Sequence, residues 1–439
     1  MITIRDPLWD TIRIDPIARR IIDSPTFQRL RYIKQLGHAH LVYPGATHTR
    51  FDHAVGVYHL AQRALRVLAE HGALDQIDDT HRSVIPLGAL LHDVGHYPFS
   101  HALEELAAGS IPGHHEELVG RFLTQPGVRE ALASVADDAA ARIEALIRGR
   151  SPNPLQGLVS GSLDLDKIEY LKRDAHFCGV PYGDVDVDRL LHALTMLSDP
   201  VTGRLEVGVQ EKGVAALESL LFAKYQMFRN VYWHHAVRAA TVLYKRVVAD
   251  ALRHGLVTGE ELVGATDEGL MHLLETRARE DAGLAAQAVT AGVRALRSRQ
   301  LPKRAAELAA ADIDESRVGD WIVTDTPVKR AVEDRIAEQL ELPPGSVFLD
   351  YPEKSMMFGL HLLVRRRSGE VLRLGPEGRA GMIGLPEVAA ELYRTARVLR
   401  LFTLGTRCDV RPDSLAALAQ QSADGVGAAL AAGVPLLAR

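Results

Sequence analysis

The chain has little cysteine, no apolar run of membrane-spanning length, and no excess of positive charge. Its 439 residues include two cysteines, Cys178 and Cys408. That is too few for a disulfide framework, so a reducing, cytoplasmic setting is expected. The missing apolar run argues against a membrane partner, and the N-terminus shows no signal peptide pattern. A formal net charge of −5 argues against nucleic acid as the main partner, because dedicated binders are usually basic.

Helical periodicity dominates the first two thirds of the chain. Apolar residues recur at spacings of three and four from Val57 to Leu68, which predicts a helix from about His53 to Gly72. A second helix is expected from about Val84 to His92, with Pro86 in its first turn, where proline is tolerated. Further helices are predicted over residues 128–148 and, with a bend, over residues 213–254.

Strand patterns appear mainly after about residue 340. Residues 346–350, 361–366 and 370–374 predict strands, the last two joined as a hairpin, and residues 204–209 predict one short earlier strand. An alanine-rich segment over residues 414–432 predicts helix. We therefore expect a mainly α fold with a helical core over residues 1–250, a helical extension over 251–340 and a small α+β subdomain over 341–439.

Four dispersed residues have the chemistry of metal ligands. They are His53, the pair His92 and Asp93 at the end of an apolar helix, and Asp166. A charged pair at the end of a buried helix is costly unless something compensates it. A hydrogen-bonded histidine and aspartate in the core would be the favoured interpretation of an isolated pair. Additional histidines at positions 96, 101, 114 and 115 favour a divalent metal instead, since imidazole and carboxylate together suit first-row ions.

These residues lie in four long segments, FQRLRYIKQLG at 27–37, YPGATHTRFDH at 43–53, LHDVGHYPFSH at 91–101 and DLDKIEYLKRD at 164–174. The order of the ligands resembles the HD superfamily of metal-dependent phosphohydrolases. The surrounding segments resemble its deoxynucleoside triphosphate triphosphohydrolase branch over roughly residues 1–240. The resemblance implies an HD-type helical core and cleavage at the α-phosphorus of a deoxynucleoside triphosphate (dNTP), releasing deoxynucleoside and triphosphate.

The resemblance implies one divalent transition metal, either Mn, Fe, Co, Ni or Zn, held by His53, His92, Asp93 and Asp166. Two imidazoles and two carboxylates balance the charge of a dication and leave positions for water and substrate. Magnesium is expected only on the triphosphate, since it prefers oxygen ligands.

The resemblance assigns proton handling near the α-phosphorus to His96, His115 and Glu116. The pKa of histidine near neutral pH suits that role. A second metal held by His96 and His115 is the alternative.

Substrate contacts are also implied by the resemblance. Arg50, Lys167 and Lys224 match phosphate-binding positions, and Gln35 and Asp174 match contacts to the sugar 3′-hydroxyl. Leu36 and Tyr232 match positions that pack where a ribose 2′-hydroxyl would sit, and such an apolar wall rejects that hydroxyl only moderately. The whole expected set is Gln35, Leu36, Arg50, His101, Lys167, Tyr170, Asp174, Lys224 and Tyr232.

Helical spacing of four puts Asp166, Tyr170 and Asp174 on one face, which is either a pocket wall or an amphipathic surface.

A regulatory nucleotide site is a further expectation. Asp23, Gln28, Arg31 and His234 match effector-binding positions of regulated relatives, which assemble as homotetramers. Helix-surface salt bridges explain Asp23, Gln28 and Arg31 equally well. Ile2 and Arg5 depart from the polar residues found in those relatives. No SAM domain is expected, because the matching segments begin almost at once.

Two other functions remain open at this point. One is a broader HD-type nucleotide phosphohydrolase or phosphodiesterase. The other is a nucleotide-sensing or nucleic-acid-binding protein with a degenerate site. The presence of all four ligand residues argues against degeneracy.

Overall fold

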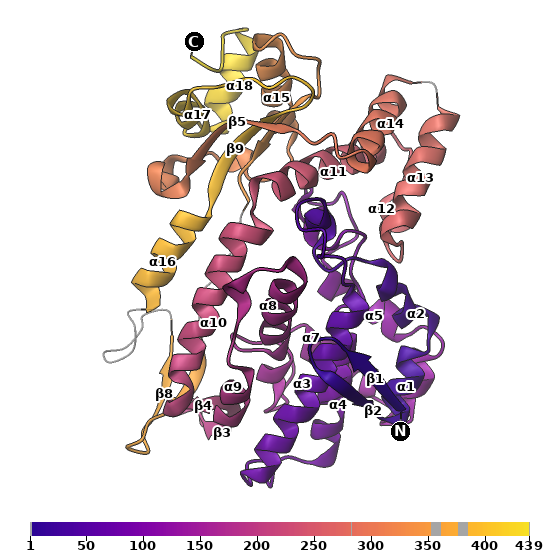
Figure 1. The fold of residues 1–439 in the computed structure, drawn as a ribbon, viewed down its shortest axis with the longest axis vertical. Coiled ribbons are helices and arrows are strands. Elements are labelled where there is room, and N and C mark those ends of the chain that lie inside the picture. Colours follow the sequence, from indigo (N-terminus) through magenta and orange to yellow (C-terminus); the bar gives the residue numbers. More distant parts are fainter. Residues whose placement is uncertain (1, 282, 353–360, 376–384, 439) are drawn as a thin grey trace.

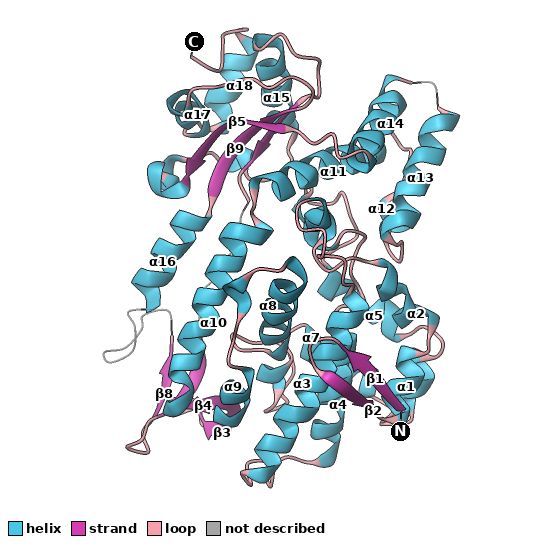
Figure 2. Cartoon of the chain, viewed as in Figure 1, coloured by secondary structure: helices cyan, strands magenta, loops and turns pink. Residues whose placement is uncertain are grey.

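The computed structural model describes residues 2–281, 283–352, 361–375 and 385–438, and it is mainly helical (Figure 2). The α-helices of the first half are α1 (Pro16–Ile22), α2 (Pro25–Gln28), α3 (Arg50–Glu70), α4 (Asp79–Leu91), α5 (His115–Leu123), α6 (Val128–Ala133), α7 (Ala139–Ile147), α8 (Leu165–Cys178) and α9 (Val187–Ala193). Those of the second half are α10 (Val214–Met227), α11 (His235–Arg253), α12 (Gly259–Leu262), α13 (Asp267–Glu280), α14 (Leu284–Arg297), α15 (Pro327–Gln339), α16 (Leu385–Ala396), α17 (Pro412–Ala419) and α18 (Ala423–Ala431).

Three small sheets complete the fold. The strands are β1 (Ile2–Asp6), β2 (Asp10–Ile14), β3 (Leu194–Ser198), β4 (Leu205–Gln210), β5 (Lys303–Ala309), β6 (Val347–Asp350), β7 (Leu362–Arg365), β8 (Val371–Leu374) and β9 (Val398–Thr403). Their orders are β1-β2, β3-β4-β7-β8 and β5-β9-β6. Among the described helices, none is both long enough and apolar enough to cross a membrane.

The helical core forms around α3, which packs against α4 and α8 (Figure 1). Thr49 caps its start, and both its backbone N–H and its hydroxyl donate to Asp52. This cap fixes the first turn, and His53 therefore points into the core with no exposed surface.

The predicted helix near Val84 begins earlier than expected. Asp78 caps α4 by accepting from the backbone N–H of His81, so Pro86 lies inside the helix and the first-turn expectation is wrong. The apolar pattern marked only the half of α4 that packs in the core, because its first turns are largely polar.

Two long predicted helices are interrupted. Residues 128–148 form α6 and α7 with a break after Ala133, where the Ser134 hydroxyl donates to the carbonyl of Ala131. Residues 213–254 were expected to form one bent helix but form α10, a π-helical turn η7 (Phe228–Tyr232) and α11. The segment expected to be helical over 414–432 likewise forms two helices, α17 and α18.

The predicted strands are confirmed, and β7 and β8 form the expected hairpin. They do not pair with β6, however. β7 runs parallel to β4, whereas β6 lies beside β9 in a second sheet that has its own hydrophobic core with α15, α17 and α18. The mainly helical core with a C-terminal α+β region is confirmed (Figure 1). The division at residues 250 and 340 stays a prediction.

Candidate metal centre and its histidine cluster

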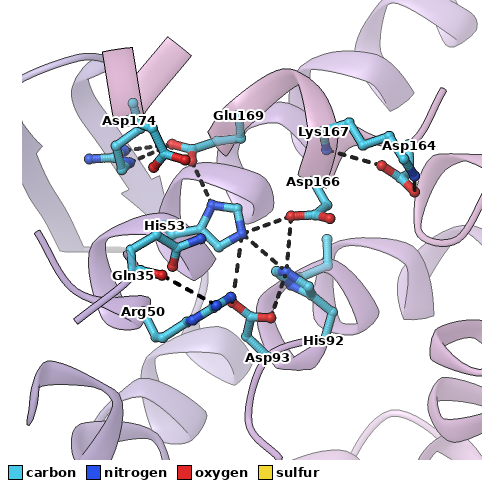
Figure 3. Close-up of polar contacts among 12 residues, drawn as sticks. Gln35, Arg50, His53, His92, Asp93, Asp164, Asp166, Lys167, Glu169 and Asp174 are labelled. Carbon is cyan, nitrogen blue, oxygen red and sulfur yellow. Dashed lines mark hydrogen bonds and ion pairs between the residues drawn. The ribbon is translucent and has the colours of Figure 1, made fainter. Parts of the chain in front are cut away.

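Three helices bring the four predicted ligands together (Figure 3). His53 lies in the first turn of α3, His92 and Asp93 follow α4, and Asp166 lies in the first turn of α8. His53 Nε2 lies 2.9 Å from Asp166 Oδ1 and 3.2 Å from His92 Nε2. Asp93 lies 3.3 Å from His92 Nε2 through Oδ1 and 3.7 Å from His53 Nε2 through Oδ2. Separations near 3 Å are those of neighbouring ligands that are each about 2.1 Å from one ion.

The other ring nitrogens of both histidines are already committed. His53 Nδ1 lies 2.7 Å from Glu169 Oε2, and His92 Nδ1 lies 2.8 Å from the carbonyl oxygen of Ala89. Both oxygens can only accept, so each Nδ1 carries the hydrogen and each Nε2 presents a lone pair. Two lone pairs and a carboxylate oxygen that face one another fit a cation between them.

The electrostatics agree with that fit. Burial alone would lower the pKa of His53, but hydrogen bonds to Asp166 and Glu169 raise it to about 10. Burial would raise the pKa of Asp93, yet Arg50 and His92 hold it well below its ordinary value. In the absence of a metal, these carboxylates favour a hydrogen on His53 Nε2 as well, and a bound ion would replace that hydrogen.

Arg50 lies beside the ligands. Its Nη1 donates to Asp93 Oδ2 at 2.7 Å, and its Nε donates to the hydroxyl of Ser100 at 3.1 Å. The side chain is almost fully buried, and this ion pair fixes Asp93.

A second cluster adjoins the first. His96 Nε2 lies 3.0 Å from Asp93 Oδ1, and the His96 ring stacks on His115 with centroids 3.8 Å apart. Glu104 Oε1 lies 2.6 Å from His115 Nδ1, and Glu104 Oε2 lies 2.8 Å from His101 Nδ1. The ligand-type atoms of this cluster lie close enough together to hold a metal ion as well; its members are His96, His101, Glu104 and His115.

Glu104 is the residue that sequence reasoning missed in this cluster. Burial would lower the pKa of His115, but Glu104 raises it above its ordinary value. Glu104 follows His101 by three residues in the 3₁₀ turn η3 (Ser100–Glu105), a spacing that could have drawn attention to it. Glu116, which was expected to handle protons, is exposed on α5.

The expected sugar contacts meet in a buried group. Asp174 accepts from the Tyr232 hydroxyl at 2.7 Å and from His48 Nε2 at 2.9 Å. Tyr170 contacts the Tyr232 ring edge to face, with centroids 6.3 Å apart. Gln35 is buried, and within the described residues its Oε1 has no hydrogen-bond partner. His48 was not anticipated from the sequence.

The remaining expected substrate contacts do not gather in one group of side chains. Lys167 Nζ donates to the carbonyl of Gly161 at 2.8 Å and pairs with Asp164 (Figure 3). Lys224 is buried in α10, and Leu36 is partly buried against the core. His101 is the most accessible histidine of the cluster, with its side chain 56% exposed.

The expected effector residues have local partners. Asp23 pairs with Arg19 at 3.3 Å on the surface of α1. Gln28 accepts from Arg31 at 2.8 Å, and the Arg31 guanidinium lies 3.5 Å from the centroid of the Phe51 ring. His234 caps α11, and burial followed by the charge of His235 lowers its pKa to about 4.

Comparison with known proteins adds to this geometry. Residues 50–158 match the family model of the HD domain, and residues 185–377 match that of the HD associated region. The chain belongs to the HD-domain family. His53, His92 and Asp93 lie within the matched HD domain, and Asp166 lies just beyond it. The family and the histidine–aspartate cluster together support a metal-binding hydrolase.

Individual relatives share only modest sequence identity with this HD-domain protein. An uncharacterized protein of Methanocaldococcus jannaschii is 34% identical over 275 residues, covering 62% of this chain and 55% of that protein. The human deoxynucleoside triphosphate triphosphohydrolase SAMHD1 is 29% identical over 265 residues, covering 53% of this chain and 42% of that protein. The chain thus spans about half the length of these curated relatives.

A solved structure shares the fold over almost the whole chain. It is a phosphohydrolase from Bacteroides thetaiotaomicron, with a TM-score of 0.70 and 21% sequence identity. It covers 92% of this chain and 100% of its own.

Proposed function

We propose that this protein hydrolyses deoxynucleoside triphosphates at the α-phosphorus, producing deoxynucleoside and inorganic triphosphate. The observation that carries the proposal is the link between the His115–Glu104 pair and the His53–His92–Asp93–Asp166 cluster, made by His96, which stacks on His115 and lies 3.0 Å from Asp93. Similarity to a protein named for this activity supports the choice of substrate.

The metal would be held by His53, His92, Asp93 and Asp166, and the mixed nitrogen and oxygen donors favour Mn, Fe, Co, Ni or Zn. When bound, such an ion polarises the phosphoryl group and activates water. Arg50 keeps Asp93 oriented through the 2.7 Å ion pair. Magnesium would accompany the triphosphate.

His115 would supply the proton that the leaving 5′-oxygen requires. Glu104 accepts from His115 Nδ1, so the ring is oriented and its charged form is favoured. The His96 ring stacks on His115 and links it to Asp93, because His96 Nε2 lies 3.0 Å from Asp93 Oδ1. Glu116 could contribute from the exposed start of α5.

The sugar would lie against Gln35, Asp174 and Tyr232. Both Asp174 oxygens already accept a hydrogen bond, and each keeps a further lone pair for the 3′-hydroxyl. Leu36 and Tyr232 would pack where a ribose 2′-hydroxyl would sit, and Tyr170 would form part of the pocket wall. Arg50, Lys167, Lys224 and His101 would contact the phosphates.

We also propose that nucleotides regulate a cytoplasmic homotetramer through Asp23, Gln28, Arg31 and His234. This part rests on the family resemblance of those positions.

The decisive experiment is product analysis. Protein loaded with Mn²⁺ is incubated with each dNTP, and the products are separated by anion-exchange chromatography. Deoxynucleoside and triphosphate in equal amounts are expected. Release of single phosphates, or turnover of ribonucleotides and cyclic phosphodiesters at equal rates, would favour a broader HD phosphohydrolase. No product with any substrate would favour a nucleotide sensor.

A further inference from the structure

The loop of the N-terminal hairpin reaches the residue that orients a metal ligand. This loop joins β1 to β2 over residues 7–9, between Asp6 and Asp10 at the strand ends. The Trp9 indole Nε1 donates to Glu169 Oε1 at 2.8 Å. Arg173 Nη2 donates to Asp6 Oδ2 at 3.0 Å. The hairpin therefore touches both members of the buried Glu169–Arg173 pair on α8.

Glu169 receives three donors and has no exposed surface. Its Oε2 accepts from His53 Nδ1 at 2.7 Å (Figure 3), and its Oε1 accepts from Arg173 Nε at 2.7 Å and from Trp9. A carboxylate fixed at both oxygens cannot rotate, so the His53 ring is fixed as well. Loss of the Trp9 donor would leave Oε1 held only by a side chain from the same helix.

Helix α3, which packs against α8, leaves space for the Glu169–Arg173 pair. A Cβ at Gly56 of α3 would lie 2.0 Å from Glu169 Oε1 and 2.8 Å from Arg173 Nη2. Glycine inside a helix costs about 1 kcal/mol relative to alanine. Its presence here is explained by the space that the Glu169 carboxylate occupies.

Hydrogen bonds and backbone geometry fix the conformation of the loop. Asp6 Oδ1 accepts from the backbone N–H groups of Leu8 and Trp9, at 2.8 and 2.9 Å. Asp10 closes the turn in the left-handed region, with φ of +59°. These constraints aim the indole at α8.

We propose that the N-terminal hairpin is a structural part of the metal centre. Trp9 positions Glu169 and Asp6 positions Arg173, and together they aim His53 Nε2 at the metal. Trp9 is thus a positioning residue, which contacts neither metal nor substrate. The inference rests on the proposed metal centre and is independent of the substrate.

The test compares Trp9→Phe with Trp321→Phe. Trp321 Nε1 also donates one hydrogen bond, to the carbonyl of Gln421 at 2.9 Å, but it lies in the C-terminal hydrophobic cluster. Each protein is loaded with Mn²⁺ and mixed with excess EDTA, and the Mn²⁺ still bound is measured over time. Supporting groups around metal ligands typically contribute about 10- to 100-fold in affinity. We expect Trp9→Phe to release Mn²⁺ about 10-fold faster than the wild type, with Trp321→Phe unchanged.

Equal release from Trp9→Phe and the wild type would overturn the proposal, as would equal acceleration in both variants. Failure of the wild type to bind Mn²⁺ would overturn the metal centre too, which distinguishes the two claims. Circular dichroism of the metal-free proteins checks folding. If Trp9→Phe does not fold, Asp6→Asn takes its place, because it keeps an acceptor for the loop N–H groups and loses the charge facing Arg173. It should also release Mn²⁺ faster, and a wild-type rate would contradict the proposal.

Discussion

The two proposed histidine ligands, His53 and His92, differ in the group that orients each ring. His53 donates to the carboxylate of Glu169, whereas His92 donates to a backbone carbonyl. A carboxylate partner makes an imidazole a stronger metal ligand than a neutral carbonyl does. In the proposed metal centre, the buried, carboxylate-bound His53 is therefore expected to be the stronger of the two nitrogen ligands.

Asp93→Asn should abolish turnover and lower the bound metal, because it removes one of the two anionic ligands while keeping the size of the side chain. It also removes the charge that faces buried Arg50. Metal content by mass spectrometry and dNTP hydrolysis are measured together, and Asp93→Ala should behave alike. Normal metal content with normal turnover would refute this site.

His115→Ala should keep the metal and slow hydrolysis by about 10²-fold or more, the usual scale for a general acid or base. Glu104→Gln should slow it in the same direction, since the ring loses its charged partner. The control is His114→Asn, which changes the adjacent exposed histidine and should leave the rate unchanged. Loss of metal from His115→Ala would instead favour a second metal in the histidine cluster.

At the level of elements, helix α3 combines three tasks along one face. Its capped first turn presents His53 to the proposed metal position, and the next turn carries Gly56 against the Glu169 carboxylate. Further along, apolar residues such as Leu60 and Leu68 fill the core. The position of the cap thus decides which residues face the site.

Gly56→Ala should lower the free energy of unfolding by about 1–3 kcal/mol, the typical cost of overpacking, despite alanine's better helix propensity. It should also weaken Mn²⁺ binding, because the added methyl displaces Glu169. Gly88→Ala in α4 is the matched control, since its Cβ would meet Leu146 and Val159 at 3.6–3.7 Å, an ordinary contact. Urea unfolding of both variants measures the difference. A stabilised Gly56→Ala protein would contradict the account.

Over the whole molecule, a buried ion network links the histidine cluster to the C-terminal sheet. Arg238 of α11 donates to Glu105 at 2.8 and 2.7 Å and to Asp350 of β6 at 2.9 and 2.6 Å. Lys245 also donates to Glu105. Glu105 directly follows Glu104, so one 3₁₀ turn faces His115 on one side and the C-terminal sheet on the other.

Arg238→Met should lower the free energy of unfolding by about 3–5 kcal/mol at neutral pH, because Asp350 is left buried without its partner. Burial would raise the pKa of Asp350, but Arg238 lowers it below the ordinary value. The ionised Asp350 therefore contributes its full stabilisation above the pKa that it has in the unfolded chain. This stabilisation is lost as the pH falls toward the lower pKa that it has in the folded protein. The free energy of unfolding of the wild type should decrease as the pH is lowered below about 4. That of Arg238→Met should decrease less steeply over the same range. Urea titrations at several pH values measure this, and parallel curves would contradict it.

If Asp23 belongs to a nucleotide site, GTP or dGTP should raise the rate of dATP hydrolysis and promote assembly in sedimentation. Asp23→Ala should lose that response while Arg19→Ala, which removes only the salt-bridge partner, should keep it. Equal behaviour of the two variants would mean that Asp23 serves only the surface of α1. Identical rates and sedimentation with and without nucleotide would exclude nucleotide-driven regulation.

The sequence by itself predicted the mainly helical class, three of the strands after residue 340 (β6, β7 and β8, but not β9) and the convergence of His53, His92, Asp93 and Asp166. Periodic apolar residues report which face is buried, and ligand-type residues in a known order report their chemistry. The starts and breaks of helices were harder to predict from the sequence, since an exposed polar turn such as that before Pro86 carries no apolar pattern.

Only the tertiary structure decided the partners of these residues. Glu104, Trp9 and His48 lie 11, 160 and 126 residues from the groups they orient. The pairing of β7 with β4 instead of β6 is equally non-local. Contacts of this kind depend on how helices and strands pack together, and no periodicity along one segment encodes them.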